Sequence, residues 1–402
     1  MTFRFHSRNH FNIGEMLILI WFVSIIILPR SNNLFLVLIY CLTFVLFLLS
    51  CFNRNCGGIV TRRSGALYLL VISFVVALID VFMFGIVSGC NTFFRYLTMY
   101  LGAPLFCYVD CMLDDDGKKR IEKKLFAFWI CVCLLQLYLY INNSSLEYAR
   151  GLASETQSYF TFVRDAYGVC IGSILIACTL LEKLLAEHKG KYLISFIICS
   201  LLIYFTKSTI FLLVYVGIVF YILVNSLILK NHKHVIASRI VLLLLIGSFI
   251  IFHSNIGQLF IQLSGNISGI VGYRLKELGL LLVYRDISLD AGSRFDLYTL
   301  SIRSFLAHPL IGSYVFSNSN INEFFGNHSE WLDILGRYGL LLGAPLICWI
   351  YYNLVKDIRI SDRKNSSHVL VIFLAGMLDP IAYFSSMFAL FFIVPGINKD
   401  WY

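Results

Sequence analysis

The apolar residues of this chain come in blocks of about 20, and this feature constrains the fold more than any other. A helix of that length crosses the hydrocarbon core of a bilayer, which is about 30 Å thick. Membrane β-barrels instead show alternating segments of about ten residues, a pattern that this sequence lacks. Because backbone polar groups must be hydrogen-bonded internally within lipid, the blocks predict membrane-spanning helices.

The composition agrees with this prediction. Of the 402 residues, 59% are hydrophobic and 14% are charged, whereas soluble domains carry about 25% charged residues. A chain this apolar has too little polar surface to cover itself in water. Nearly all of the 12 cysteines lie in apolar runs, which favours small buried side chains over disulfides or metal ligands. We therefore expect no metal and no cofactor.

The blocks predict an all-α polytopic membrane protein with 11 or 12 transmembrane helices. We expect spans near residues 13–30, 34–52, 65–87, 93–109, 125–141, 166–185, 192–206, 209–229, 239–255 and 332–355. The stretch 368–396 counts as one span or two, because Asp379-Pro380 in its middle indicates a bend or a tight turn. The first run ends without a small-residue cleavage site, so we interpret it as an uncleaved span. Residues 1–402 then form a single integral membrane domain.

The basic residues indicate the orientation of these spans. With a cytoplasmic N-terminus, 20 of the 32 lysines and arginines lie in inward segments, as the positive-inside rule requires. Of the other twelve, which face outward or lie within spans, nine are arginines, the residue suited to bidentate phosphate recognition. Topology does not need positive charge on the outer side. The arginines on the outer side therefore indicate an anionic ligand at that face. Nucleic acid is not expected as a partner.

Two predicted outer segments are long, at about 142–163 and 254–331, and a loop as long as the second is usually functional. Within it, residues 259–283 have apolar side chains at helical spacing and predict an amphipathic helix on the membrane surface. A second helix is predicted to be capped by Ser293, with Asp296 three residues later, and to end before Pro309. Arg294 and Arg303 lie on opposite faces of that helix. Because Arg303 has Asp296 as a local partner, Arg294 is the better ligand-binding candidate.

The end of this loop carries a further group of polar residues. Glu330 and Asp333 fall in the first turn of the next predicted span, where carboxylates suit the helix dipole. Asp333 can also pair with Arg337, four residues later. Structure alone can explain these three residues. His328 precedes the helix and has no evident structural role.

These segments together resemble a known family. GSRFDLYTLSIRSFLAHPLIG, followed by NHSEWLDILGRYGLLLG, is similar to the signature of the O-antigen polymerase and O-antigen ligase superfamily. Thr206-Lys207-Ser208-Thr209 is similar to a basic turn of that family, with Lys207 where Arg is common. The resemblance covers residues 200–345, and it rests on the order, spacing and outer placement of motifs that are each weak alone.

The resemblance implies a metal-independent glycosyltransferase of the helical membrane (GT-C-like) type. Its donor would be an oligosaccharide on undecaprenyl pyrophosphate, presented at the periplasmic face of the bacterial inner membrane. By motif position, Arg294 would bind the pyrophosphate, and His328 would act as the base or position the acceptor. Additional substrate-binding residues would be Lys207, Arg164, Arg150, Arg303 and Glu330. Membrane lipids, a chain-length regulator and a flippase are the further partners expected.

Three functions remain open at this stage. A polymerase would transfer the growing glycan to a lipid-linked repeat unit, and we favour it because the HSEWLDILGRYG form resembles the polymerases more closely. A ligase would transfer the glycan to lipid A-core. A transporter or flippase of lipid-linked glycans would place polar residues at mid-membrane in broken or repeated helices, whereas here they concentrate in the outer loop.

Overall fold

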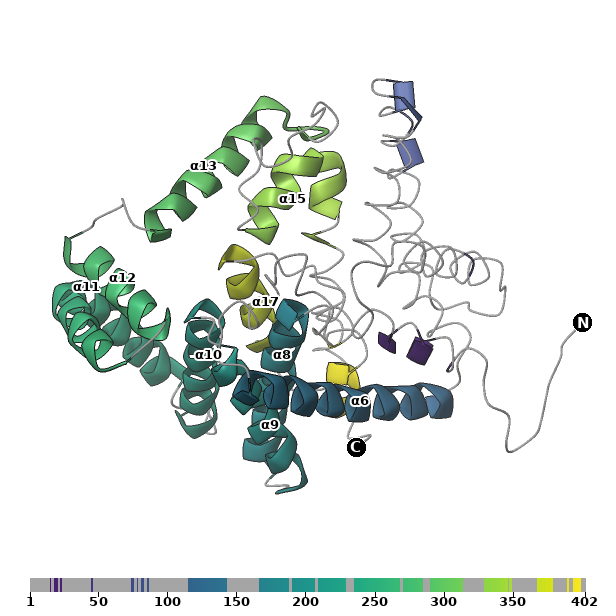
Figure 1. Cartoon of the computed structure of the whole chain (residues 1–402), viewed down its shortest axis with the longest axis horizontal. Helices are drawn as coiled ribbons and strands as arrows, with labels where there is room; N and C mark the ends of the chain where they lie inside the picture. Colours follow the sequence, from purple (N-terminus) through teal and green to yellow (C-terminus); the bar gives the residue numbers. More distant parts are fainter. Residues whose placement is uncertain are drawn as a thin grey trace, which may run out of the picture.

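The computed structural model describes most of the chain from residue 115 onward and isolated residues before it. The described residues are 15, 18–20, 22–23, 45, 74–75, 78, 81–82, 85–86, 115–142, 166–187, 190–206, 209–228, 235–267, 270–284, 290–313, 329–345, 347–348, 367–378, 389 and 393–398. Helices and turns account for these residues, and no strand occurs among them. The predicted all-α class is confirmed for this part of the chain (Figure 1).

Four helices cover predicted apolar blocks, although the first of them begins ten residues before the predicted range 125–141. They are α6 (Asp115–Asn142), α8 (Ala166–Glu187), α9 (Leu193–Phe205) and α10 (Thr209–Ile228), with the short 3₁₀ helix η2 (Gly190–Tyr192) before α9. Two segments, Asp116–Asn142 and Gly168–Leu185, are long and apolar enough to cross a membrane, judged by length and composition. Most residues of the predicted spans 13–30, 34–52 and 65–87, and all of 93–109, lie outside the described residues.

The side chain of Trp129 on α6 reaches α8. Its side chain is fully buried, and its indole N–H donates a hydrogen bond to Ser173 Oγ at 3.2 Å. A Cβ atom on Gly172 would lie 2.4 Å from the indole ring, so only glycine at this position lets the ring reach the backbone of α8. Phe22 contacts the same ring, with 6.2 Å between the ring centroids. The core therefore joins α8 to the N-terminal run through one large aromatic side chain.

α11 (Val235–Asn266) and α12 (Ile270–Tyr284) form an antiparallel hairpin and lie side by side in Figure 1. A Cβ atom on Gly257 would lie 2.8 Å from the carbonyl oxygen of Gly279, and one on Gly279 would lie 2.6 Å from that of Gly257. The two backbones thus approach too closely for side chains at this crossing. The single surface helix predicted over 259–283 is therefore wrong, because its two halves belong to different helices.

The remaining helices pack against one another and against the α8–α10 helices. α13 (Asp290–Ala307) ends before Pro309 as predicted, but it begins at Asp290, so Ser293 lies within the helix rather than capping it. α15 (Glu330–Tyr338) continues into the π-helix η5 (Gly339–Gly343). α17 (Ser367–Leu378) lies between α15 and the α8–α10 helices (Figure 1), and α19 (Val394–Asn398) packs on α8.

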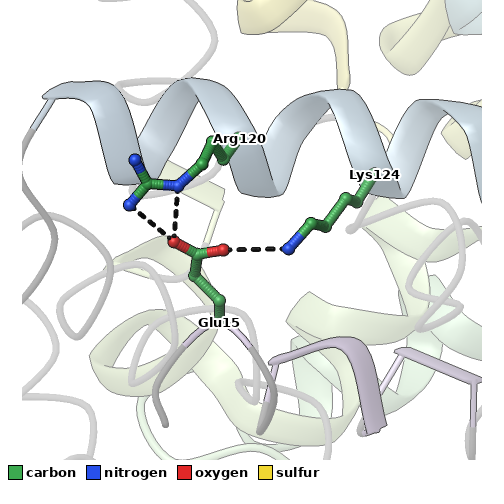
Figure 2. A network of polar contacts seen from close by, with 3 residues as sticks. All are labelled: Glu15, Arg120 and Lys124. Carbon is green, nitrogen blue, oxygen red and sulfur yellow. Dashed lines mark hydrogen bonds and ion pairs between the residues drawn. The ribbon is translucent and has the colours of Figure 1, made fainter. Parts of the chain in front are cut away.

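Glu15 connects the N-terminal run to the start of α6. Figure 2 shows its carboxylate between two cations of that helix. Arg120 Nε donates to Oε1 at 3.0 Å, and Lys124 Nζ donates to Oε2 at 3.1 Å. Only 6% of the Glu15 side chain is exposed, whereas Arg120 and Lys124 are 53% and 42% exposed. The carboxylate is therefore buried, whereas the side chains of its two partners are partly exposed to solvent.

This asymmetry predicts unequal effects of substitution. Arg120→Ala/Lys124→Ala leaves a buried carboxylate without these two donors, which is costly. Glu15→Gln removes the anion from two cations that are already half-exposed to water, which costs less. We expect the double variant to have the lower thermal unfolding temperature in detergent. Lys119→Ala/Lys123→Ala removes the same charge from exposed positions of α6, and an equal loss in that control would argue against the network.

Candidate functional site

Two sequence motifs that are separated in the chain meet where α13 packs against α15, side by side in Figure 1. We call residues 290–313 and 329–343 together the α13–α15 unit. Ser301 of α13 donates a hydrogen bond to Asp333 Oδ1 of α15 at 2.5 Å. Ser301 and Asp333 are buried, with 1% and 5% of their surfaces exposed. A buried hydrogen bond to a carboxylate therefore joins the two helices.

The first turn of α15 is fixed by Ser329 and Asp333. Ser329 is the N-cap and accepts a hydrogen bond from Leu332 N, while its own N–H donates to Asp333 Oδ2 at 3.3 Å. Ser329 Oγ also lies 3.3 Å from the carbonyl oxygen of Gly376, to which it donates. The indole N–H of Trp331 donates to Phe373 O at 3.1 Å. The start of α15 is therefore tied to both α13 and α17.

The turn after α13 docks against the junction of α15 and η5. Pro309 cannot continue the helix, and its carbonyl oxygen instead accepts the N–H of Leu340 at 2.8 Å. The next carbonyl, that of Leu310, accepts the N–H of Leu341 at 2.9 Å. The N–H of Ser313 donates to Gly336 O at 2.9 Å. The turn thus satisfies backbone groups where the helical hydrogen-bonding pattern changes.

Two glycines make this docking possible. Gly312 and Gly339 have φ angles of 76° and 60°, in the left-handed region that favours glycine. A Cβ atom on Gly312 would lie 2.0 Å from Arg337 O, and one on Gly339 would lie 2.4 Å from Leu310 O. Each glycine therefore lets the backbone of one motif touch the other. Gly312 and Gly339 thus both belong to the contact between the turn after α13 and the junction of α15 and η5.

Alanine at either position is expected to open this contact. The added methyl group meets backbone oxygen and also strains a positive φ, so we expect the free energy of unfolding to fall by about 2 kcal/mol or more for Gly312→Ala or Gly339→Ala. Thermal unfolding in detergent measures the loss. Gly265→Ala is the control, because a Cβ atom there meets nothing within 4 Å. A stability of Gly312→Ala equal to that of the control would contradict the docking.

The candidate residues from the sequence fall into two groups. Arg294, Arg303 and Glu330 belong to the α13–α15 unit, whereas Lys207, Arg150, Arg164 and His328 lie outside the described residues. Arg294 is the fifth residue of α13, and its side chain also lies outside the description. Arg303 is exposed on α13, and Glu330 is 4% exposed in the first turn of α15. His328 directly precedes the described N-cap Ser329.

Sequence reasoning missed the residues that hold the unit together. Asp333 was explained by the helix dipole and by a pairing with Arg337, yet its carboxylate binds Ser301 and the backbone of Ser329. Ser301 lies in the middle of a predicted helix, and the sequence indicated no role for it. The available signal was the pair Ser301 and Ser304 on one face of α13, both buried. Two small polar residues on a buried helix face indicate a polar contact with a neighbour.

The α13–α15 unit carries three arginines and four acidic residues. Among the described residues, no group of three His, Cys, Asp or Glu could hold a metal ion. Comparison of the chain with protein-family models and with curated proteins found no match.

Proposed function

We propose that this chain is a membrane-embedded polymerase of surface polysaccharide. It would transfer a growing glycan from undecaprenyl pyrophosphate to a lipid-linked repeat unit at the periplasmic face of the bacterial inner membrane. The observation that carries the proposal is the contact between the two motifs, in which Gly312 touches Arg337 and Gly339 touches Leu310. The two motifs, whose order resembles that of the polymerase and ligase superfamily, form one unit. Its first segment carries Arg294, and its second segment begins directly after His328.

Exposed apolar surface supports the placement in a membrane. One face of α9 leaves Leu193, Ile197, Leu201 and Tyr204 each at least 44% exposed. α6 has a similar face, with Leu134, Tyr138 and Ile141 at least 49% exposed. Apolar surface in water costs about 25 cal/mol per Å², and lipid tails remove that cost. These faces are suited to contact with the bilayer.

The Glu15 network supports the proposed orientation. The positive-inside pattern places both the N-terminus and the Lys118–Lys124 segment in the cytoplasm. Glu15 at the beginning of the first predicted span contacts Arg120 and Lys124 at the beginning of α6. Two segments assigned to the same side of the membrane are thus in contact, and the α13–α15 unit belongs to the periplasmic side in this topology.

The reaction requires a fixed positive charge and a proton acceptor. The acceptor hydroxyl attacks the anomeric carbon of the donor, the bond from that carbon to the pyrophosphate oxygen breaks, and lipid pyrophosphate leaves. Arg294 would neutralise the departing pyrophosphate. His328 would take the proton of the attacking hydroxyl. Lys207, Arg150 and Arg164 would add positive charge for the donor, and the exposed Arg303 would contact the glycans. Glu330 is 4% exposed, so its side chain is too buried for the glycan contact expected from the sequence.

Deletion of the gene tests the proposal. In a strain that carries its polysaccharide on lipid A, we expect a surface-polysaccharide gel of the deletion to show core with one repeat unit and no ladder. Re-expression of the chain should restore the ladder. Bare core would indicate a ligase. Polymerisation of repeat units already present at the periplasmic face, if unchanged in the deletion strain, would indicate a transporter.

A further inference from the structure

A kink divides α11 into two parts. Phe252 has non-helical φ and ψ angles of −99° and 16°, and it lies near the end of the span predicted over residues 239–255. Beyond the kink, the chain continues as a helix to the turn and then packs back on itself through α12. We call residues 253–267 and 270–284 together the α11–α12 hairpin. In the predicted topology this hairpin lies at the outer surface of the membrane.

The part of α11 beyond the kink has three different faces, as follows from about 100° of rotation per residue. The first face contacts α12 and includes Gly257 and Ile261. The second face carries Leu259 and Leu263, which are 52% and 42% exposed. The third face, roughly 75° from the second, carries the exposed side-chain amides of Asn255, Gln258, Gln262 and Asn266. We call this third face the amide face.

The amide face is polar and carries no charge. Between residues 255 and 266 the sequence contains no Asp, Glu, Lys, Arg or His. Lysine and glutamate form helices as well as glutamine does and better than asparagine, so helix formation alone does not explain the amides. From Asn255 to Asn266 the face extends along about 16.5 Å of the helix axis. It therefore offers hydrogen bonds over this length without attracting ions of either sign.

This chemistry matches a neutral ligand rich in hydroxyl groups. A side-chain amide both donates and accepts hydrogen bonds, as a sugar hydroxyl does. A phosphate headgroup would instead favour arginine or lysine. The neighbouring face with Leu259 and Leu263 is suited to the bilayer, and a helix with such a face lies in the interface between lipid and water. The amide face would then lie beside the lipid headgroups, at the level where a lipid-linked sugar leaves the membrane.

We propose that the amide face of the α11–α12 hairpin binds the sugar residues of the lipid-linked glycan. This inference rests on the proposed function, and it gives the glycan a binding surface separate from the pyrophosphate candidates. α12 contacts α13, so a glycan on the hairpin remains next to the α13–α15 unit. Loss of the amides should release the growing chain early, which shortens the polysaccharide while the first transfers continue.

The test measures binding of soluble glycan to the purified full-length protein in nanodiscs. The probe is the polysaccharide of the producing strain, released from its lipid by mild acid and titrated by saturation-transfer NMR. We expect Gln258→Ala/Gln262→Ala to weaken binding by about tenfold, because hydrogen bonds to the sugar are lost. Alanine is the best helix former, so this variant should keep its fold. Binding equal to that of the wild type would overturn the proposal.

Two controls isolate the role of the amide face. Asn142→Ala removes an exposed amide at the end of α6, which also lies on the predicted outer side, and it should bind the glycan like the wild type. Lys276→Ala removes an exposed cation from α12 and should also retain the affinity. A loss of binding in Lys276→Ala beside normal binding by Gln258→Ala/Gln262→Ala would show that the hairpin attracts anionic groups, against the proposal.

Complementation of the deletion strain distinguishes this inference from the proposed function. We expect Gln258→Ala/Gln262→Ala to give a shorter ladder on a polysaccharide gel, and Asn142→Ala to give a normal one. If the wild-type protein polymerises lipid-linked repeat units in nanodiscs but does not bind the soluble glycan, this inference is wrong and the proposed function stands. If the deletion strain keeps its ladder, both fail together.

Discussion

Arg294→Ala is expected to abolish long-chain glycan while the protein remains in the membrane at its normal amount. The guanidinium would oppose the charge that develops on the leaving pyrophosphate, and loss of one such group costs about 100- to 1,000-fold in rate. Position 294 lies in the first turns of α13, away from the buried Ser301–Asp333 contact, so folding should not depend on its charge. The deletion strain is complemented with the variant. A polysaccharide gel then measures the length of the glycan, and a membrane immunoblot measures the amount of protein in the membrane.

Arg303→Ala provides the comparison on the same helix. Arg303 is exposed and lies on the face opposite to Arg294, and we expect it to contribute less to donor binding. Its substitution should shorten the ladder without removing it. Arg294→Lys keeps the charge but loses the bidentate geometry, so an intermediate ladder is expected. Full-length chains with Arg294→Ala would show that this position does not bind the pyrophosphate.

The helices that the sequence predicted well are those whose ends are set by length and local chemistry. α8, α9 and α10 match apolar blocks within two residues at each end, because polar or charged residues interrupt the hydrophobic runs on both sides. The end of α13 before Pro309 follows from the steric restriction that proline places on the preceding residues. These signals are local, so one sequence contains them.

The hairpin of α11 and α12 was missed because periodicity alone does not reveal a reversal of direction. Apolar positions keep helical spacing through 259–283 whether the chain continues or turns back. The cluster Ser264-Gly265-Asn266 was the turn signal, and it should have outweighed the spacing. The close crossing of Gly257 and Gly279 depends on a pairing of two helices, which single positions do not indicate.

The candidate site was predictable in its motifs and not in its connections. Gly312 and Gly339 stood out as motif glycines, but only the fold shows that each meets the backbone of the other motif. Asp333 satisfied a local explanation, and its partner Ser301 lies 32 residues away. A residue with a sufficient local role gives no sign in the sequence of a tertiary role, so the connecting residues were the ones missed.

His328→Ala is the second substitution with a large expected effect, and it should act on a different step from Arg294→Ala. A proton acceptor positioned at the attacking hydroxyl contributes about 100- to 10,000-fold to the rate. The donor pyrophosphate would still be bound by arginine, so binding of a lipid-linked repeat unit should persist while turnover is lost. Turnover and donor affinity of the purified protein in nanodiscs, measured side by side, separate the two roles.

His253→Ala is the control, because His253 lies half-buried on α11, outside the α13–α15 unit, and should retain wild-type turnover. Comparison with Arg294→Ala gives the decisive contrast. If His328→Ala weakens donor affinity as strongly as Arg294→Ala does, the histidine serves the pyrophosphate and another group must accept the proton. If turnover is unchanged, the motif histidine is not part of the chemistry. A loss of turnover with intact donor affinity is the result that assigns His328 to the acceptor hydroxyl, because a residue that acts only on the donor would change both quantities.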